Sequence, residues 1–580
     1  MTAFTRLGKG GRIDRSRTLA FTYDGQRLFG HAGDTLASAL LANGRLLVGR
    51  SFKYHRPRGF MSAGVEEANG LFTVGEGNRA EPNIAGTMVP LEEGLVARSQ
   101  NAWPSPAFDL MAVNSLAAPL FGTGFYYKTF MGPFKKSWMF YEPFIRKAAG
   151  MGKADSAKDG ARHDVEYSFC DVLVVGAGPA GLTAALAAGR AGAKVLVAEQ
   201  DSDLGGSLLS ESSDALERWR TGTLAELQAL PNVTLFTRTT AQGIYDGNQV
   251  TLAQLLPTGQ LLHVIRAQTI IMATGALERP LVFTNNDRPG VMLASALRTY
   301  LNRYALAPAA RAVIATNNDT AYATAFALAE AGVAVTIAEE RSAPAGDLLA
   351  QAAALGIAIF PNAGIADVTG DKQLRAVRLK GRHSVTIDCD ILAMSGGWNP
   401  AVHLTSHGGI KPKYDAAIAA FVPGGFAEGQ FGAGSMLGHF GLHAAVRDGE
   451  AAARAALARC AISKVPAPVE PPAVRDDRPY GIATAADPFD VTLPAKAFVD
   501  FQHDVTAKDI KVAHQEGFQS VEHLKRYTTL GMATDQGKTS NVNALAMMAA
   551  LRGLTPEQAG TTTFRPPYTP LTVGALAGRS

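Results

Sequence analysis

The stretch from Asp171 to Ser207 constrains the fold of this 580-residue chain more than any other. It holds a β-branched run, a GxGxxG turn, an alanine-rich helix and a second apolar run that ends beside Glu199. Gly176 permits the tight turn, Gly178 lets the backbone approach a pyrophosphate, and Gly181 lets helix and strand pack closely. The pattern predicts an α/β fold of the Rossmann type with an adenine dinucleotide at this turn. The alternative is a relic turn with an empty crevice.

Three further features favour a dinucleotide without a 2′-phosphate. Glu199 stands about 20 residues beyond the turn, where an acidic side chain accepts hydrogen bonds from an adenosine ribose. Gly206 and Ser207 form a second small-residue turn that would line the same ribose and pyrophosphate. A late glycine-rich stretch, 431–441, would close over the dinucleotide. These features fit NAD or FAD.

A second Rossmann-like unit spans residues 305–390, but its glycine positions hold other residues. They read Thr316, Asn318 and Ala321, and a Cβ atom at the first two obstructs both the turn and the approach of a phosphate. We therefore expect a single dinucleotide, in the first unit. The alternative is that the side chains of Thr316, Asn317 and Asn318 bind phosphate.

Composition argues against several classes of function. The 55 basic and 51 acidic residues nearly balance, which leaves no electrostatic case for nucleic acid. Three cysteines are too few and too scattered for a disulfide framework or a metal cage, and this usage suits a reducing cytoplasm. The first ten residues lack the apolar core of a secretion signal, and no apolar run of about 18 residues could span a bilayer. We expect a cytoplasmic protein with neither nucleic-acid nor membrane partners.

Residues 1–100 predict a β-grasp module, with a hairpin around Asp24-Gly25 and a helix from Asp34 to Asn43. The run FKYHRPRG, residues 52–59, resembles the lead-in to the cluster loop of ferredoxin-like domains in amine and amino-acid oxidoreductases. Those domains hold a 2Fe–2S cluster through cysteine thiolates. Because none of the matching positions is a cysteine, the sequence predicts no iron–sulfur cluster. These positions are Ser62, Glu67 and Gly70.

Residues 101–165 are rich in aromatic side chains and read as a loop-like connecting segment that ends in a polar linker, Met151 to Asp164. The preferred interpretation is a segment wrapped on another domain or subunit, with its rings buried. Interleaved basic residues leave a nucleic-acid or membrane-surface role open. They are Lys128, Lys135, Lys136 and Arg146.

Residues 485–565 read as a helical domain that resembles the small 2Fe–2S module of bacterioferritin-associated ferredoxin. None of its four ligand positions holds a cysteine, since they read Asp500, Gln502, Asp535 and Ser540. Nearby polar residues could hold an anion such as a flavin phosphate, or they could form a solvated, salt-bridged helix face. These residues are Lys525, Arg526, Thr528 and Lys538.

The expected fold class is α/β, a two-dinucleotide-binding Rossmann core of the FAD/NAD type. We expect a β-grasp ferredoxin-like domain without cluster cysteines at residues 1–100 and a connecting segment at 101–165. The dinucleotide-binding domain has two parts, 166–304 and 391–465, and a degenerate Rossmann-like domain at 305–390 lies between them. A small helical domain without cluster cysteines follows at 485–565, and a linker at 566–580.

Taken together, the motifs of the chain point to one family. FKYHRPRG, GAGPAG, NDRPGVM, SGGWNP, VEHLKRYTTLGMATDQGKTSN and TTFRPPYTP occur in this order. With them the chain resembles the amino-terminal part of the α subunit of heterotetrameric sarcosine oxidase. The resemblance implies oxidation of sarcosine to glycine with oxygen, which yields hydrogen peroxide. It also implies NAD on this chain, FMN at the interface with a β subunit that carries FAD and FMN, and additional γ and δ subunits.

The resemblance also assigns NAD contacts to particular residues. Ala180, Glu199, Gln200, Asp201 and Ser207 fall on NAD-contact positions of the family. Gly434 and Leu437 are a looser match, and we place Ala241 in the same site. Whether this NAD is structural or redox-active stays open. The family's folate-binding domain would follow Ser580, so no tetrahydrofolate site is assigned to these residues.

No constellation suits general acid–base or nucleophilic catalysis, so we expect neither a catalytic residue nor a metal site on this chain. His403 and His407 have the i, i+4 spacing of metal ligands, but a third ligand and a helical context are lacking, which favours a structural role. Two other functions stay open. One is the A subunit of a related amino-acid or opine dehydrogenase, which the absent cluster cysteines disfavour. The other is a free-standing NADH-dependent flavin reductase.

Overall fold

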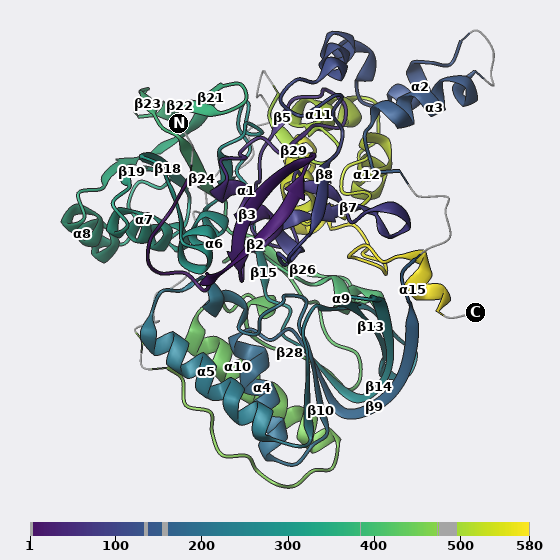
Figure 1. Ribbon diagram of the computed structural model, residues 1–580, viewed down its shortest axis with the longest axis vertical. Helices are drawn as coiled ribbons and strands as arrows, with labels where there is room; N and C mark the ends of the chain where they lie inside the picture. The colour runs from purple at the N-terminus through teal and green to yellow at the C-terminus, as the bar shows by residue number, and fades with distance from the viewer. Residues whose placement is uncertain are drawn as a thin grey trace. The chain divides into compact units, whose positions relative to one another are not determined.

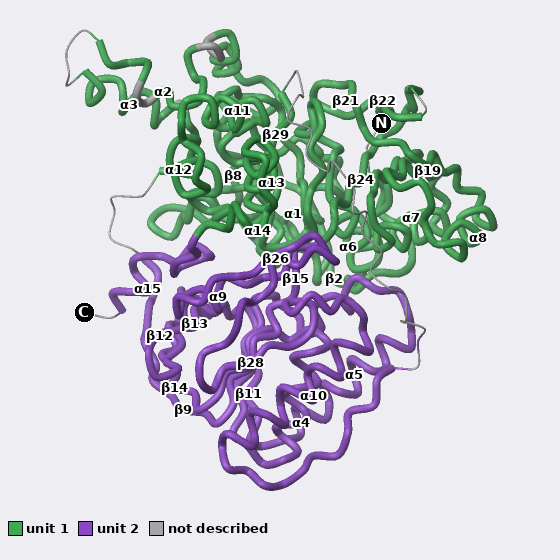
Figure 2. Tube along the Cα trace, turned by 180° about the vertical axis from the view of Figure 1, so that it is seen from behind, with its two compact units in different colours: residues 1–157, 278–397, 481–562 green, residues 158–277, 398–480, 563–580 purple. Residues whose placement is uncertain are grey.

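The computed structural model describes residues 4–132, 137–153, 160–382, 384–472, 474 and 496–578 (Figure 1). The chain forms two compact units, each built from segments that are distant in sequence (Figure 2). Unit 1 comprises Met1–Ala157, Glu278–Gly397 and Gly481–Thr562, and unit 2 comprises Lys158–Leu277, Trp398–Tyr480 and Thr563–Ser580. The expected basic residues Lys135 and Lys136, residues 154–159 of the expected linker and residues 485–495 of the expected helical domain lie outside the described residues.

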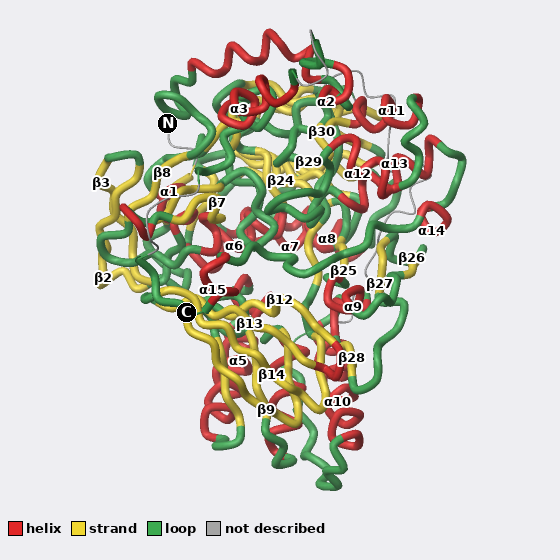
Figure 3. The backbone as a smooth tube through the Cα atoms, turned by 90° about the vertical axis from the view of Figure 1, so that its right-hand side faces the viewer, coloured by secondary structure: helices red, strands yellow, loops and turns green. Residues whose placement is uncertain are grey.

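Unit 2 is organised around a seven-stranded sheet in the order β11-β10-β9-β14-β13-β12, with β28 paired to β14. The expected βαβ unit is present as β9 (Asp164–Val175), α4 (Pro179–Arg190) and β10 (Val195–Ala198), with the two strands parallel. The helices α4, α5 (Asp214–Ala229) and α10 (Leu442–Arg459) gather on one face of the parallel strands (Figure 3), where alanine and leucine side chains form a shared core. The other elements are β11 (Val233–Phe236), β12 (Thr239–Tyr245), β13 (Gln249–Leu256), β14 (Gly259–Met272) and β28 (Gln430–Gly432).

Unit 1 contains a second parallel sheet, in the order β16-β24-β18-β19-β20. The expected second βαβ unit is β18 (Arg311–Thr316), α7 (Thr320–Glu330) and β19 (Ala334–Glu339). The remaining elements of this part are β16 (Val291–Leu293), β20 (Ala358–Pro361), β24 (Ile391–Ser395), α6 (Ala294–Tyr304), α8 (Gly346–Ala354) and a small antiparallel sheet of β21 (Ala363–Gly370), β22 (Leu374–Gly381) and β23 (Thr386–Asp388).

The N-terminal part of unit 1 is a five-stranded sheet that packs on one helix. The expected hairpin turns at Asp24 and Gly25, whose φ values of 47° and 78° are those of a type I′ turn. The helix α1 (Leu36–Ala42) starts later than predicted, because Thr35 and not Asp34 is its N-cap. Asp34 instead accepts hydrogen bonds from Arg6 and Ser38. The strands, in sheet order, are β3 (Gln26–Ala32), β2 (Asp14–Tyr23), β8 (Val96–Ser99), β6 (Leu71–Val74) and β7 (Glu81–Ala85).

The C-terminal part of unit 1 is helical, as expected. A short hairpin of β29 (Phe498–Asp500) and β30 (Val505–Thr506) leads into α11 (Ala507–Gln515). The helices α12 (Val521–Thr528) and α13 (Asn541–Leu551) pack with it around one apolar core. The hydroxyls of Thr506 and Ser520 cap α11 and α12.

The prediction of a loop-like segment over 101–165 is wrong for its central part. A 3₁₀ helix, η3 (Leu110–Phe121), is followed by α2 (Phe125–Lys128) and α3 (Trp138–Ala148). The aromatic rings of this segment differ in burial: Phe125 is buried, whereas Trp103 and Phe140 are 62% and 68% exposed. Among the described residues, no helix combines the length and apolar character needed to cross a membrane.

Candidate dinucleotide site and buried polar clusters

The first βαβ turn has the backbone that its glycines predict. Gly176 has a φ of 98°, and a Cβ atom there would lie 2.3 Å from the Ala273 carbonyl oxygen. A Cβ on Gly181 would lie 1.9 Å from the Gly176 carbonyl oxygen, so only glycine allows this close packing. At Gly178, by contrast, the nearest atom to an added Cβ is the Gly206 Cα at 3.9 Å. The space in front of Gly178 is therefore open, as a pyrophosphate site requires.

Two further glycine segments meet this turn. A Cβ on Gly206 would lie 2.8 Å from the Gly178 Cα, and a Cβ on Gly434 would lie 2.9 Å from the Ala180 Cβ. Both glycines have positive φ, 54° and 72°. The short 3₁₀ helices η4 (Gly206–Ser210) and η6 (Gly434–Leu437) therefore flank the N-terminus of α4. Three segments of the predicted site thus come together within unit 2.

Glu199 is buried at the end of β10. Its Oε2 accepts a hydrogen bond from the Ala177 N–H at 2.8 Å, and its Oε1 accepts one from the Asp201 N–H at 2.9 Å. Burial raises the pKa of Glu199, and these backbone donors act in the opposite direction. A carboxylate bound by one N–H on each oxygen keeps lone pairs for the hydroxyls of a ribose.

The other predicted NAD contacts lie around the same turn with different exposure. Gln200 and Ser207 are exposed, whereas Leu437 is half-buried at the end of η6. Ala241 is buried on β12, two residues from Thr239, whose N–H donates to the Glu199 carbonyl at 2.7 Å. The start of β12 therefore lies next to Glu199.

Sequence analysis missed Asp448 on α10. Its Oδ2 accepts from the Gly434 N–H at 3.3 Å and hydrogen-bonds with His439 Nδ1 at 2.6 Å. The Asp448 carboxylate thus holds the late glycine turn from the helix that follows it. Only the position of Asp448, about two helical turns beyond the glycine-rich stretch, could have pointed to this role.

The second βαβ turn is filled by its own side chains. Thr316 Oγ1 accepts from the Asn318 N–H at 3.0 Å and donates to the Asn318 carbonyl at 2.8 Å. The Asn318 amide donates to Ser395 Oγ at 3.0 Å. Glu339, at the ribose-binding position, accepts from Tyr322 Oη at 2.9 Å and from the Arg341 guanidinium at 2.8 Å. These contacts support the expectation that this turn holds no dinucleotide.

In the N-terminal module, Glu67 organises the loop that was compared with a cluster loop. Its Oε2 accepts from the Met61 and Ser62 N–H groups at 2.9 and 2.7 Å. Its Oε1 accepts from the Asn69 and Gly70 N–H groups at 2.7 and 2.8 Å. Burial raises the pKa of Glu67, although the four donors act against that rise. The three positions compared with cluster ligands therefore lie together, joined by one carboxylate.

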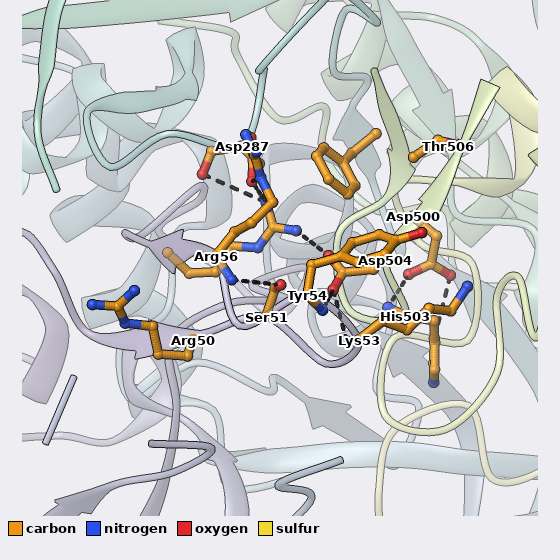
Figure 4. A network of polar contacts seen from close by, with 12 residues as sticks. Arg50, Ser51, Lys53, Tyr54, Arg56, Asp287, Asp500, His503, Asp504 and Thr506 are labelled. Carbon is orange, nitrogen blue, oxygen red and sulfur yellow. Dashed lines mark hydrogen bonds and ion pairs between the residues drawn. The ribbon is translucent and has the colours of Figure 1, made fainter. Parts of the chain in front are cut away.

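The four positions compared with the second cluster module are also buried and close together. Gln502 Oε1 accepts from the Asp535 N–H at 2.7 Å, and Asp535 Oδ2 accepts from Ser540 Oγ at 3.4 Å. Asp500 Oδ2 accepts from the Gly531 N–H at 2.7 Å. Burial and the nearby charge of Asp500 raise the pKa of Asp535 to about 6. Figure 4 shows Asp500 pointing toward His503, whose Nδ1 lies 3.4 Å from its carboxylate.

A buried ion network joins three parts of unit 1 (Figure 4). The Arg56 guanidinium donates to both carboxylate oxygens of Asp287 at 2.6 and 2.7 Å. Arg58 lies 2.7 Å from Asp287 and pairs with Asp504. Asp504 Oδ2 also accepts from the Lys53 N–H at 2.8 Å. Sequence reasoning missed this network, although both arginines belong to the FKYHRPRG motif and Asp287 to the NDRPGVM motif.

The residues predicted to hold a flavin phosphate differ in their surroundings. Lys538 is buried, its Nζ donates to the Asp535 carbonyl at 3.1 Å, and burial lowers its pKa to about 8. Thr528 is buried, and its hydroxyl donates to the Leu524 carbonyl at 2.7 Å. Lys525 is half-buried and Arg526 is exposed in the last turn of α12. Of the four residues, Arg526 is the exposed one, and its guanidinium lies 3.8 Å from the Glu522 carboxylate.

His403 and His407 do lie on a helix, α9 (His403–His407), which corrects the expectation of a non-helical context. The His403 ring stacks on Tyr568 with a centroid distance of 4.0 Å. Burial lowers the pKa of His407 to about 4. In the described part of the chain, no three His, Cys, Asp or Glu side chains are grouped so as to hold a metal ion.

Three family models match the chain. Residues 170–421 match the pyridine nucleotide-disulphide oxidoreductase family, and residues 494–579 match the sarcosine oxidase A3 domain. Residues 16–102 match the 2Fe-2S iron-sulfur cluster binding domain. This last match contradicts our prediction that the chain carries no iron–sulfur cluster, which rested on the residue types at three positions. Ser62, Glu67 and Gly70 themselves offer no thiolate ligand to such a cluster.

Comparison with known proteins extends over the whole chain. The chain is 47% identical to sarcosine oxidase subunit alpha of Rhizobium meliloti (strain 1021), over 99% of this chain and 59% of that protein. It is 36% identical to sarcosine oxidase subunit alpha of Corynebacterium sp. (strain P-1), over 98% of this chain and 57% of that protein. It therefore spans about three fifths of the length of these relatives. The crystal structure of L-proline dehydrogenase from P. horikoshii has the same fold, with a TM-score of 0.67, 18% identity and coverage of 99% of this chain and 100% of that one. Over its whole length, and with an A3 domain at residues 494–579, the chain looks like the α subunit of sarcosine oxidase.

Proposed function

We propose that this chain is the α subunit of a sarcosine oxidase complex, which oxidatively demethylates sarcosine to glycine and forms hydrogen peroxide. The identity of 47% over 99% of the chain supports this proposal. The reaction oxidises a CH–NH group with oxygen as the acceptor, and flavins supply that chemistry. In our proposal FAD lies on a partner β subunit, FMN lies at the interface with it, and γ and δ subunits complete a heterotetramer. In this complex, the chain would bind NAD and form one side of the FMN site.

The NAD proposal rests on the open space in front of Gly178. Gly176 and Gly181 are required by contacts within the chain, whereas no chain atom lies closer than 3.9 Å to a Cβ placed on Gly178. Glycine at this position is thus explained by an approaching ligand, and the N–H groups at the start of α4 suit a pyrophosphate. The Glu199 carboxylate would repel a 2′-phosphate, which favours NAD over NADP.

The residues of this chain act on NAD by binding and orientation. Ala177 and Asp201 fix the Glu199 carboxylate from both sides, and Asp448 fixes the turn at Gly434. For FMN, we propose that Lys525 and Arg526, at the C-terminal end of α12, face the phosphate of a flavin bound against a partner chain. Lys538 and Thr528 would support this helix end from beneath, since both are buried.

The test is to identify the nucleotide that the purified chain retains. The chain is purified without added nucleotide, denatured with acid, and the supernatant is analysed by mass spectrometry. We expect NAD at about one equivalent per chain. Release of FAD would favour a free-standing flavin reductase, and release of no nucleotide would contradict the NAD assignment.

A further inference from the structure

We propose that the guanidinium of Arg238 packs on the face of the adenine ring of the bound NAD. This inference rests on the proposed function, because that function places NAD at the first βαβ turn. It assigns a role to a residue at the base-binding end of the site, for which neither the glycine motif nor Glu199 accounts. Arginine guanidinium groups are planar and stack on aromatic faces, and adenine offers such a face.

The order of the parallel strands determines which part of a dinucleotide meets which strand. The strands β11, β10 and β9 are neighbours in this order and run parallel. The proposed pyrophosphate site follows β9 at Gly178, and the proposed ribose site follows β10 at Glu199. A ligand that extends along the carboxyl ends of the strands therefore reaches the end of β11 next, with its adenine ring. The two residues that follow β11 are Thr237 and Arg238.

Hydrogen bonds hold the end of β11 against the ribose end of the site. Ala198, the last residue of β10, is in register with Phe236, the last residue of β11. The Glu199 N–H donates to the Phe236 carbonyl at 2.9 Å, and the Arg238 N–H donates to the Asp201 carbonyl at 2.8 Å. The backbone of Arg238 thus lies directly beside the segment that carries the Glu199 carboxylate.

Arg238 has an unusual backbone conformation. Its φ of 51° lies in the left-handed region, which glycine and asparagine adopt more readily than arginine does. The conformation turns the chain from β11 into β12, because the next residue, Thr239, starts β12 and donates its N–H to the Glu199 carbonyl at 2.7 Å. Other residues than glycine in this region are concentrated at ligand-binding sites. Glycine would make the same turn at a lower cost, so we attribute the arginine to its side chain.

Arg238 also has the exposure and the charge that a base-stacking residue needs. It is half-buried, which leaves part of its surface for contact with a ligand. Three turns follow β9, β10 and β11, at residues 176–178, 199–201 and 237–238, and Arg238 is the single basic residue in their sequences. The other residues of these turns are neutral or acidic. A cation above an aromatic ring is attracted by the negative face of that ring.

Distance and charge disfavour a phosphate as the partner of Arg238. Neighbouring strands lie about 4.8 Å apart, so β11 is roughly 10 Å from the strand that precedes the pyrophosphate site. A 2′-phosphate would lie beside the carboxylate of Glu199, which repels it. The adenine ring has neither restriction, and stacking on an arginine adds cation–π attraction to the burial of the base.

The experiment measures the affinity of the full chain for nucleotides by isothermal titration calorimetry, after the bound NAD has been removed. Arg238→Met should weaken the binding of NAD and of ADP-ribose about tenfold each, since both ligands carry adenine. Arg238→Trp should restore the affinity to within about threefold of the wild type, because an aromatic ring stacks on adenine without a charge. The tryptophan fluorescence of this variant should fall when NAD binds.

The matched control is Arg266→Met, because Arg266 is exposed and lies in the middle of β14, away from its carboxyl end. It should bind both ligands as the wild type does, and all variants should melt within a few degrees of the wild type. If Arg238→Met does not fold, Arg238→Gly takes its place, since glycine accepts a φ of 51° without strain.

Each other outcome decides against the stacking role of Arg238 in its own way. If the wild type binds NAD and Arg238→Met binds it equally well, the stacking role is refuted while the proposed function stands. If the wild-type chain binds no NAD, the proposed NAD site fails and takes the inference with it. If Arg238→Met lowers the affinity and Arg238→Trp does not restore it, or if the loss is confined to NADP, the partner of Arg238 is a phosphate and the assignment is wrong.

Discussion

Arg58 pairs with Asp504, a residue 446 positions further along the chain, and both side chains are buried. Arg58 also lies 2.7 Å from Asp287, so one guanidinium neutralises two buried carboxylates. Burial lowers the pKa of Arg58 to about 10, so the side chain stays charged at neutral pH. The contact ties the N-terminal module to the second Rossmann sheet and to the helical part of unit 1.

Arg58→Met should destabilise unit 1 strongly. Removing one partner of a buried ion pair leaves an uncompensated charge, which typically costs about 3–5 kcal/mol. The free energy of unfolding, followed by urea denaturation, should fall by that order. The matched control is Arg98→Met, because Arg98 is 63% exposed and lies 3.7 Å from Glu76, where the expected loss is below about 0.5 kcal/mol. Equal losses in the two variants would contradict a central role for Arg58.

The structural features that the sequence predicted correctly are those fixed by residues close together in the chain. The GxGxxG turn and the hairpin at Asp24 each depend on residues a few positions apart, and each is present. The Arg58–Asp504 pair depends on segments that only the folded chain brings together, so no periodicity reveals it.

Two other predictions were wrong: the loop-like character of the segment that holds η3, and the absence of an iron–sulfur cluster from the N-terminal module. The 3₁₀ helix η3 follows a period of three, which a search for the 3.6-residue α-helical period does not detect. At the N-terminal module, we inferred the absence of a cluster from Ser62, Glu67 and Gly70 alone, and the match of residues 16–102 to a cluster-binding family contradicts that inference. For the presence of a cluster, the residue types at three positions and the sequence pattern of residues 16–102 therefore lead to opposite predictions.

Glu67→Gln should loosen the loop between Met61 and Gly70. The native carboxylate accepts hydrogen bonds from four backbone N–H groups. In glutamine an NH₂ group replaces one of the two oxygens, so two of these N–H groups would face a donor instead of an acceptor. Leaving buried donors unsatisfied costs about 1–3 kcal/mol. Hydrogen exchange of the Ser62 and Gly70 amides should accelerate, and the melting temperature should fall. Glu92→Gln, at an exposed site in the same module, is the control, and unchanged exchange in Glu67→Gln would refute the role of Glu67.

Stability should depend on pH through Asp535. Its pKa is raised to about 6 in the folded chain, above the usual value of 3.8, so the folded state binds more protons between these two values. The free energy of unfolding should therefore fall as the pH rises from about 4 to about 6, by on the order of 2–3 kcal/mol. Asp535→Asn should remove this slope, as measured by urea unfolding at a series of pH values. The same slope in wild type and variant would show that Asp535 does not titrate in this window.

Lys538 should give the opposite slope at alkaline pH. Burial lowers its pKa to about 8 from the usual 10.5, so between these values the unfolded state binds more protons than the folded state. Stability should rise as the pH increases through that window. Lys538→Met should flatten the rise, whereas Lys511→Met, at an exposed position of α11, should leave it intact. A rise that persists in Lys538→Met would assign it to another group.

Gly178→Val should abolish nucleotide retention without unfolding unit 2. Apart from the neighbouring residues, no chain atom lies closer than 3.9 Å to the first side-chain carbon, so this carbon fits the protein while the side chain fills the space assigned to the pyrophosphate. The control is Gly222→Val on α5, because a Cβ there also meets no atom within 4 Å. Acid release and mass spectrometry should find NAD in the wild type and the control, with at least a tenfold loss in Gly178→Val, at roughly equal melting temperatures after NAD is removed. Full retention of NAD by a folded Gly178→Val chain would place the nucleotide elsewhere.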